Sequence, residues 1–203
     1  MQAKLNLKHK KGTGISPQAF NDGMTKNQEE FKSWYERFTW EGKEEAAFFA
    51  DHGLEKGIYC QILCTDWCPD VIWNLPVLLR VLERASIPTE ILPMEEHLET
   101  MDLFLINGGR NQPIAIFLNA DGDVLGRWGA RPQYIQAVMD EFRRQNPDRE
   151  APGYQEKVSM ARKEIAKIYN AGTEYQNVVV QEVHRLIASF ADRSENHAIT
   201  RRP

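Results

Sequence analysis

The stretch Gly57-Ile-Tyr-Cys-Gln-Ile-Leu-Cys-Thr-Asp-Trp-Cys-Pro-Asp-Val71 decides how the middle of this chain folds. Residues 57–64 are mostly apolar, which is typical of a strand buried in the centre of a sheet. Pro69 is favoured in the first turn of a helix, and apolar residues then recur on one helical face over residues 69–84. A strand that leads directly into this helix places Cys68 at the helix N-cap.

The N-cap position gives Cys68 a candidate chemical role. Its thiol would face unpaired backbone N–H groups and the positive end of the helix dipole, and both favour the nucleophilic thiolate. Asp66 and Asp70 flank the cysteine, and a carboxylate near a thiolate raises the pKa of the thiol. Asp70 also suits the first helical turn, and Asp66 could instead relay a proton to a leaving sulfur. The sequence leaves open which effect governs Cys68.

Cys60, Cys64 and Cys68 are the only cysteines of the chain. One such cluster, in a chain whose first residues lack an apolar signal segment, indicates redox chemistry, metal binding or buried packing in the cytoplasm. A structural zinc site needs a second pair of ligands, so we expect neither a metal nor another cofactor. Cys60 is expected in the core. Cys64 can pair with Cys68 only if their Cα atoms come within about 7 Å.

Strands and helices continue to alternate after the first helix. We expect strands at 88–93, 113–118 and 123–128, a turn at Asp121-Gly122, and helices at 95–105 and 131–145. The order β-α-β-α-β-β-α over residues 57–145 predicts an α/β fold. Its early strands are parallel, and its late hairpin makes the sheet mixed.

The flanking segments differ in composition from this central unit. Residues 1–14 hold four lysines and no acidic residue, so we expect residues 1–15 to form a basic, solvated tail. A helical extension is expected at 16–56, opened by Ser16-Pro17, containing a Thr25–Gln28 capping box and stopped at His52-Gly53. The remaining boundaries are an α/β domain at 57–147, a C-terminal helical extension at 148–193 and a tail at 194–203.

The spacing of several residues resembles the thioredoxin family. Trp67-Cys68-Pro69 is similar to the start of the family's Trp-Cys-x-x-Cys element, and Pro76 lies eight residues beyond Cys68, where the family has a kinking proline. Pro113 resembles the cis-proline that packs against the active-site sulfur, and Gly129 the glycine before the last helix. The resemblance implies a thioredoxin-like fold and a cis Gln112–Pro113 bond. It also implies a substrate groove formed by Trp67, Pro69, Gln112 and Pro113.

Two departures from the family pattern bear on activity. The family's second active-site cysteine would fall at Val71, and its buried aspartate at Ile62. The Cys-Pro-Asp-Val sequence therefore cannot close the usual disulfide. Trp-Cys-Pro-Asp resembles a less characterised bacterial branch of thioredoxin-like proteins.

Four functions remain open at this point. Cys68 acts alone on protein or low-molecular-weight thiols and disulfides, or Cys64 serves as its resolving thiol. Alternatively, the groove is a non-catalytic peptide- or protein-binding module. A thiol peroxidase would need a Thr or Ser shortly before the cysteine, and Thr65 stands three residues before Cys68.

Composition excludes several partner classes. The 203 residues carry 25 basic and 29 acidic side chains, so the net charge of −4 disfavours nucleic acid as a partner. No stretch approaches the roughly 18–20 apolar residues of a membrane span. The sequence leaves the oligomeric state open.

Overall fold

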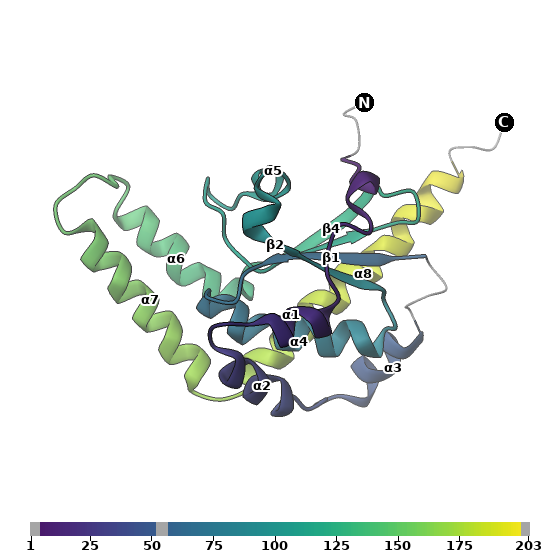
Figure 1. Cartoon of the computed structure of the whole chain (residues 1–203), viewed down its shortest axis with the longest axis horizontal. Coiled ribbons are helices and arrows are strands. Elements are labelled where there is room, and N and C mark those ends of the chain that lie inside the picture. Colours follow the sequence, from purple (N-terminus) through teal and green to yellow (C-terminus); the bar gives the residue numbers. More distant parts are fainter. Residues whose placement is uncertain (1–4, 52–56, 200–203) are drawn as a thin grey trace.

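A four-stranded mixed sheet forms the centre of the computed structural model, which describes residues 5–51 and 57–199, the last nine of these by backbone only. The strand order is β2-β1-β3-β4 (Figure 1). β1 (Tyr59–Cys64) pairs parallel with β2 (Thr89–Pro93) and antiparallel with β3 (Ile114–Leu118), which pairs antiparallel with β4 (Val124–Gly129). The mixed α/β sheet expected from the sequence is confirmed.

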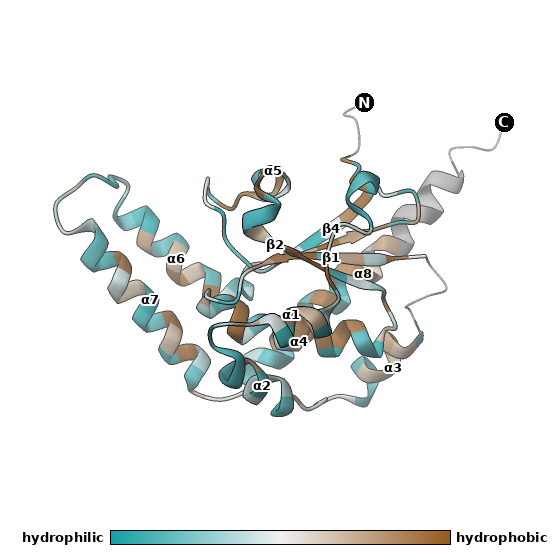
Figure 2. Cartoon of the chain, viewed as in Figure 1, coloured by the Kyte–Doolittle hydropathy of each residue, from teal (hydrophilic) through white to brown (hydrophobic). Residues whose placement is uncertain are grey.

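Successive residues of β1 serve two separate apolar layers. Cys60, Ile62 and Cys64 face the larger layer, which contains the buried sides of α4 (Pro69–Arg84) and α8 (Glu174–Ile199). Tyr59 and Leu63 face a smaller layer. Figure 2 shows hydrophobic colour concentrated on the central strands, with hydrophilic colour on part of β4. Because both faces are covered, the whole strand is buried, as its apolar run predicts.

The helix expected at 95–105 is divided into three short pieces. These are η3 (Met94–Glu96), α5 (Leu98–Met101) and η4 (Asp102–Phe104). Met94, Met101 and Phe104 cover the smaller apolar layer. The apolar spacing is therefore met by consecutive turns rather than by one regular helix.

The N-terminal segment corrects the expectation of a solvated tail over residues 1–15. From residue 5 onward it lies against the sheet, contains the short helix η1 (Lys8–Lys10) and buries Leu7 in the smaller layer. Leu7 N–H donates to the Gly122 carbonyl at 2.8 Å, and Ile15 bridges Ile91 at the edge of β2. Residues 1–4 lie outside the described residues.

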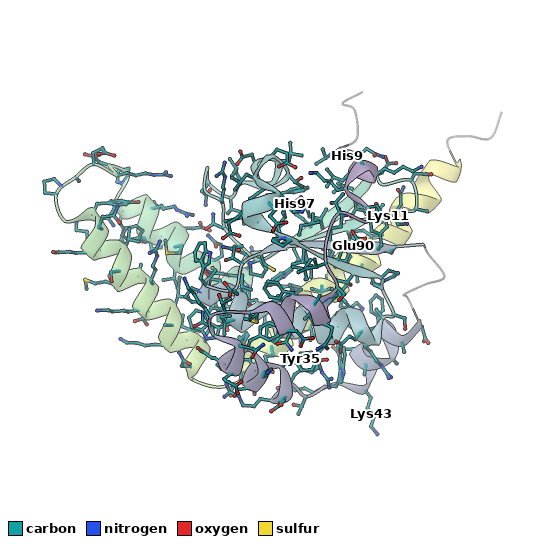
Figure 3. The ribbon with its side chains drawn as sticks, viewed as in Figure 1. His9, Lys11, Tyr35, Lys43, Glu90 and His97 are labelled. Atoms are coloured by element: carbon teal, nitrogen blue, oxygen red, sulfur yellow. The ribbon has the colours of Figure 1, made fainter. Side chains whose placement is uncertain are left out.

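Hydrogen bonds and charge interactions explain why this lysine-rich segment packs against the rest of the protein. Glu90 on β2 accepts hydrogen bonds from Gly12 N–H at 2.8 and 3.1 Å, and Figure 3 shows Lys11 and Glu90 near one another. Lys11 lies 4.8 Å from the ring centre of Tyr59, and Lys10 pairs with Glu99. Acidic residues elsewhere in the chain thus bind this basic segment, and composition alone did not show which of them do so.

Leu7→Ala is expected to lower the free energy of unfolding by about 2–5 kcal/mol, because it leaves a cavity under a side chain that is 1% exposed. Urea unfolding followed by circular dichroism measures the loss. Leu5→Ala is the matched control: Leu5 is 38% exposed, so the change should stay within about 0.5 kcal/mol. Equal effects of the two substitutions would show that the segment does not belong to the folded unit.

Three helices follow before the sheet begins: α1 (Pro17–Gly23), α2 (Gln28–Glu36) and α3 (Lys43–Asp51). The Ser16 cap is confirmed, since its hydroxyl accepts a hydrogen bond from Ala19 N–H at 3.0 Å. The prediction of a Thr25–Gln28 capping box is wrong. Asn27 is the N-cap of α2, because Thr25 is held by Asp66 instead. The expected stop at His52-Gly53 lies outside the described residues.

The C-terminal helices form a projecting hairpin and a return to the sheet. α6 (Gln133–Gln145) contacts α7 (Tyr154–Asn170), and the pair extends away from the sheet in Figure 1. α8 packs on α4 and β4 after a turn at the predicted residues 170–173. It continues to Ile199, so most of the tail expected at 194–203 is helical. Residues 200–203 lie outside the described residues.

Candidate active site

Cys68 occupies the N-cap of α4, as the sequence predicts. It is the only one of the three cysteines, all of them described, that is not buried. Its side chain lines a pocket of about 380 Å³ whose wall also contains Trp67, Pro69, Asp70 and Gln112. Five of the eight predicted site residues therefore meet at one pocket.

The loop before β3 places backbone groups against the sulfur. The Gln112–Pro113 peptide bond is cis, and Cys68 Sγ lies 3.9 Å from the carbonyl oxygen of Gln112. Gly129 ends β4 beside this loop with φ of 139°. A Cβ there would collide with the carbonyl oxygen of Pro113, so only glycine fits. The start of α4, the loop before β3 and the end of β4 therefore meet at this site.

The environment of Cys68 resolves the competition that the sequence left open. Burial, with a smaller contribution from the charge of Asp70, raises the pKa of the Cys68 thiol to about 11. The backbone N–H groups of Val71 and Asp70 and the charge of Arg131 oppose this change. The helix terminus thus favours the thiolate as expected, but burial and the adjacent carboxylate outweigh it.

Asp70 forms the principal ion pair of the pocket wall. Its carboxylate accepts two hydrogen bonds from Arg131, from Nε at 2.7 Å and from Nη2 at 2.5 Å. The two side chains are only 11% and 10% exposed. Burial raises the pKa of the Asp70 carboxyl, and Arg131 counteracts that rise. The guanidinium of Arg131 also donates to Gln136, which fixes the pair in place.

Asp66 lies outside the pocket and has a structural role. Its Oδ2 accepts hydrogen bonds from Thr25 N–H at 2.8 Å, Thr25 Oγ1 at 3.0 Å and Lys26 N–H at 3.1 Å. Although partial burial opposes it, these hydrogen bonds lower the pKa of the Asp66 carboxyl. Asp66 therefore connects the loop before α2 to the end of β1, and it does not line the pocket of Cys68.

Cys60 and Cys64 point into the larger apolar layer. Burial raises the pKa of both thiols well above its usual range, and for Cys64 the charge of Cys68 adds to the effect. Thr65 is also buried, and it lines a different pocket with Cys64. The sequence places these residues close to Cys68 along the chain, but the fold buries all three, and none of them lines the pocket of Cys68.

A family model described as Thioredoxin matches residues 14–143. The chain belongs to the thioredoxin family. Two solved structures share the fold: a protein of unknown function from Pseudomonas aeruginosa, solved at 1.5 Å, and an HIV epitope scaffold. They are 18% and 16% identical, with TM-scores of 0.62 and 0.57, and each comparison covers 87% of this chain and 93% of the other. No curated protein matches the chain.

This thioredoxin chain departs from its family at two buried positions. Val71, where the family has its second cysteine, and Ile62, where it has a buried aspartate, are both completely enclosed in the larger apolar layer. An apolar side chain at each position is compatible with its surroundings. Among the ionisable side chains that line the pocket, Asp70 and Arg131 act on the pKa of the Cys68 thiol.

The C-terminal extension completes the pocket of Cys68. The sequence did not predict this contribution. Arg162, Ile165 and Ala166 of α7 line it together with Trp73 of α4. Trp73 stacks on Tyr169 with ring centres 4.4 Å apart, and Asn74 Nδ2 donates to Tyr169 Oη at 2.7 Å. The apolar stripe of 153–170 indicated packing, but nothing in the sequence indicated what it packs against.

The described part of the chain contains neither a candidate metal site nor a candidate membrane-spanning helix. It contains no cluster of three His, Cys, Asp or Glu side chains arranged to hold a metal ion. None of its helices has the length and apolar character needed to cross a lipid bilayer.

Proposed function

We propose that this protein carries out thiol–disulfide exchange through Cys68 alone. Cys68 loses its proton to solvent, and its sulfur attacks a disulfide R–S–S–R, which forms Cys68–S–S–R and releases RS⁻. A second thiolate R′S⁻ then attacks the R sulfur of this bond, which forms R–S–S–R′ and releases Cys68 as a thiolate that takes up a proton. The observation that supports this proposal is that Cys68 is the only unburied cysteine and borders the pocket beside cis-Pro113.

The raised pKa of Cys68 shapes the expected kinetics. A thiol with a pKa of about 11 is mostly protonated at neutral pH, so its attack is slow. The same property makes Cys68 a poor leaving group, so a mixed disulfide on Cys68 decays slowly. We therefore expect an accumulating adduct rather than rapid turnover. Three free thiols suit a reducing compartment, and we infer a cytoplasmic setting.

Cys68→Ser is expected to abolish adduct formation with 2-hydroxyethyl disulfide, because no other cysteine is accessible in the folded protein. Intact-protein mass spectrometry of the reduced chain measures the adduct, and peptide mapping locates it. Cys60→Ser is the control and should retain the full adduct, since its sulfur is buried. An undiminished adduct in Cys68→Ser protein, or none in the wild type, would contradict the proposal.

The role of Cys64 can be tested in the step that releases the small thiol from the mixed disulfide on Cys68. A resolving Cys64 would expel the small thiol from Cys68 and leave a Cys64–Cys68 disulfide two mass units below the reduced protein. Complete burial of Cys64 favours release by an external thiol instead. Cys64→Ser should therefore leave the lifetime of the adduct unchanged, and a longer lifetime would assign resolution to Cys64.

The second candidate is a non-catalytic binding module that uses the same pocket. The raised pKa of Cys68 and the apolar Val71 favour it over a rapid oxidoreductase. Binding of a partner that persists in Cys68→Ser protein would support this function. A peroxidase is less well supported, because Thr65 does not line the pocket of Cys68 and Arg131 is occupied by Asp70.

A further inference from the structure

Three arginines line the pocket of Cys68, and two of them are neutralised by carboxylates. Arg110 makes a two-pronged pair with Asp102, at 2.7 and 2.8 Å, and Arg131 makes its pair with Asp70. These carboxylates hold the two guanidiniums in fixed orientations. They also leave little net charge from either arginine for a ligand.

Arg162 on α7 is different. It lines the same pocket and is exposed, and within the described residues it has no ion pair or hydrogen bond to a carboxylate. Its charge nevertheless acts on the pocket wall, since it opposes the rise in the pKa of the Asp70 carboxyl that burial causes. The pocket therefore has one uncompensated positive charge, and it lies on the wall contributed by the C-terminal extension.

Two further groups in the wall have unused hydrogen-bonding capacity. Trp73 Nε1, a donor, and Gln112 Oε1, an acceptor, are buried without a partner among the described residues. Their side chains are 7% and 3% exposed. An unpaired buried polar group is costly, but both atoms are enclosed by the protein. The group that the pocket wall presents to a ligand without a carboxylate partner is therefore the Arg162 guanidinium.

The pocket volume of about 380 Å³ is in the range of small-molecule sites. We propose that Arg162 selects small disulfides that carry a carboxylate, holding that group while the sulfur reacts with Cys68. This inference rests on the proposed exchange reaction and adds its substrate class. Arg162 is a specificity-determining residue in this scheme, because it acts on the ligand's remote charge and not on the reacting sulfurs.

The test uses three symmetrical disulfides of nearly equal size: dithiodipropionate (anionic), 2-hydroxyethyl disulfide (neutral) and cystamine (cationic). The rate of Cys68 adduct formation is measured by mass spectrometry under one set of conditions. Each rate is divided by the rate of the same disulfide with N-acetylcysteinamide, a free thiol without a carboxylate, which removes differences in intrinsic reactivity. The full chain is used throughout.

Wild-type protein should react about two- to fivefold faster with the anionic probe than with the neutral one, as expected for a partly exposed charge pair. The preference should shrink at 0.5 M salt (~4 Å screening length). Arg162→Ala should remove it, Arg162→Glu should reverse it, and Arg162→Lys should retain part of it. Lys163→Ala removes the same charge from the same helix outside the pocket lining, so it should leave the preference unchanged.

The outcomes separate this inference from the reaction on which it depends. Equal normalised rates for the three probes, with Cys68 still modified, would overturn the role of Arg162 and leave the exchange reaction intact. An anionic preference that survives Arg162→Ala would also overturn it. No adduct with any probe would overturn the proposed function itself.

Discussion

Alkylation of Cys68 is expected to accelerate about tenfold with each unit of pH between 7 and 10, without reaching a plateau. Only the thiolate reacts, and burial together with Asp70 raises the pKa of this thiol to about 11. At pH 7 the reactive fraction is then on the order of one in ten thousand. The rate near neutral pH should be correspondingly small, about a hundredfold or more below that of a free cysteine whose pKa is about 8.5.

Iodoacetamide labelling with peptide mapping measures this profile for each cysteine separately. N-acetylcysteinamide, which has no carboxylate, is the reference, and its rate should level off as the pH rises past about 8.5. Circular dichroism at each pH checks that the protein remains folded. This matters because a thiol whose pKa is raised by folding contributes stability below its unfolded pKa and loses it as the pH rises toward 11. A Cys68 plateau at or below pH 8.5 would show a prepared thiolate and contradict the dominance of burial and Asp70.

Asp70→Ala is expected to lower the free energy of unfolding by about 3–5 kcal/mol, because it leaves the buried Arg131 guanidinium without its carboxylate. Urea unfolding gives the value. Glu141→Ala is the matched control: it breaks the exposed pair with Arg144, so its cost should stay below about 1 kcal/mol.

A compensated variant separates charge from packing at this position. Asp70→Ala combined with Arg131→Met removes both charges and should recover most of the lost stability, because no buried charge remains unpaired. A cost below about 1 kcal/mol for Asp70→Ala alone would show that Arg131 reaches solvent when its partner is absent. Asp70→Ala should also shift the Cys68 alkylation profile to lower pH, since the Asp70 charge raises the pKa of that thiol.

Local patterns were sufficient to locate Cys68. The apolar run before it predicts a buried strand, and Pro69 predicts the first helical turn, so the N-cap lies between them. The Asp121-Gly122 turn is local in the same way, because Gly122 adopts φ of 87°, a left-handed conformation that favours glycine. These features depend on neighbours a few residues apart, which the sequence shows directly.

Residue patterns failed where a side chain had two possible partners. Thr25 and Gln28 have capping-box spacing, yet Thr25 binds Asp66, which is 41 residues away. The lysines of the N-terminal segment indicated a solvated tail, but Leu7 and the acidic residues of β2 and α5 hold the segment on the sheet. In each case a long-range contact replaced the local one.

The sequence by itself determined a mixed α/β order of elements and the position of one cysteine at a helix start, because hydrophobic periodicity and turn chemistry act over short spans of chain. The thioredoxin fold was implied by a resemblance to the family in the spacing of Cys68, Pro76 and Pro113. The tertiary structure alone decided the state of that cysteine. The Arg131 that neutralises Asp70 is 61 residues away, and the Arg162 that charges the pocket is on a helix outside the strand-helix unit. Burial and charge depend on what the fold brings together in space, so the reactivity of Cys68 could be read only after α4, the Gln112–Pro113 loop and α7 had been placed side by side.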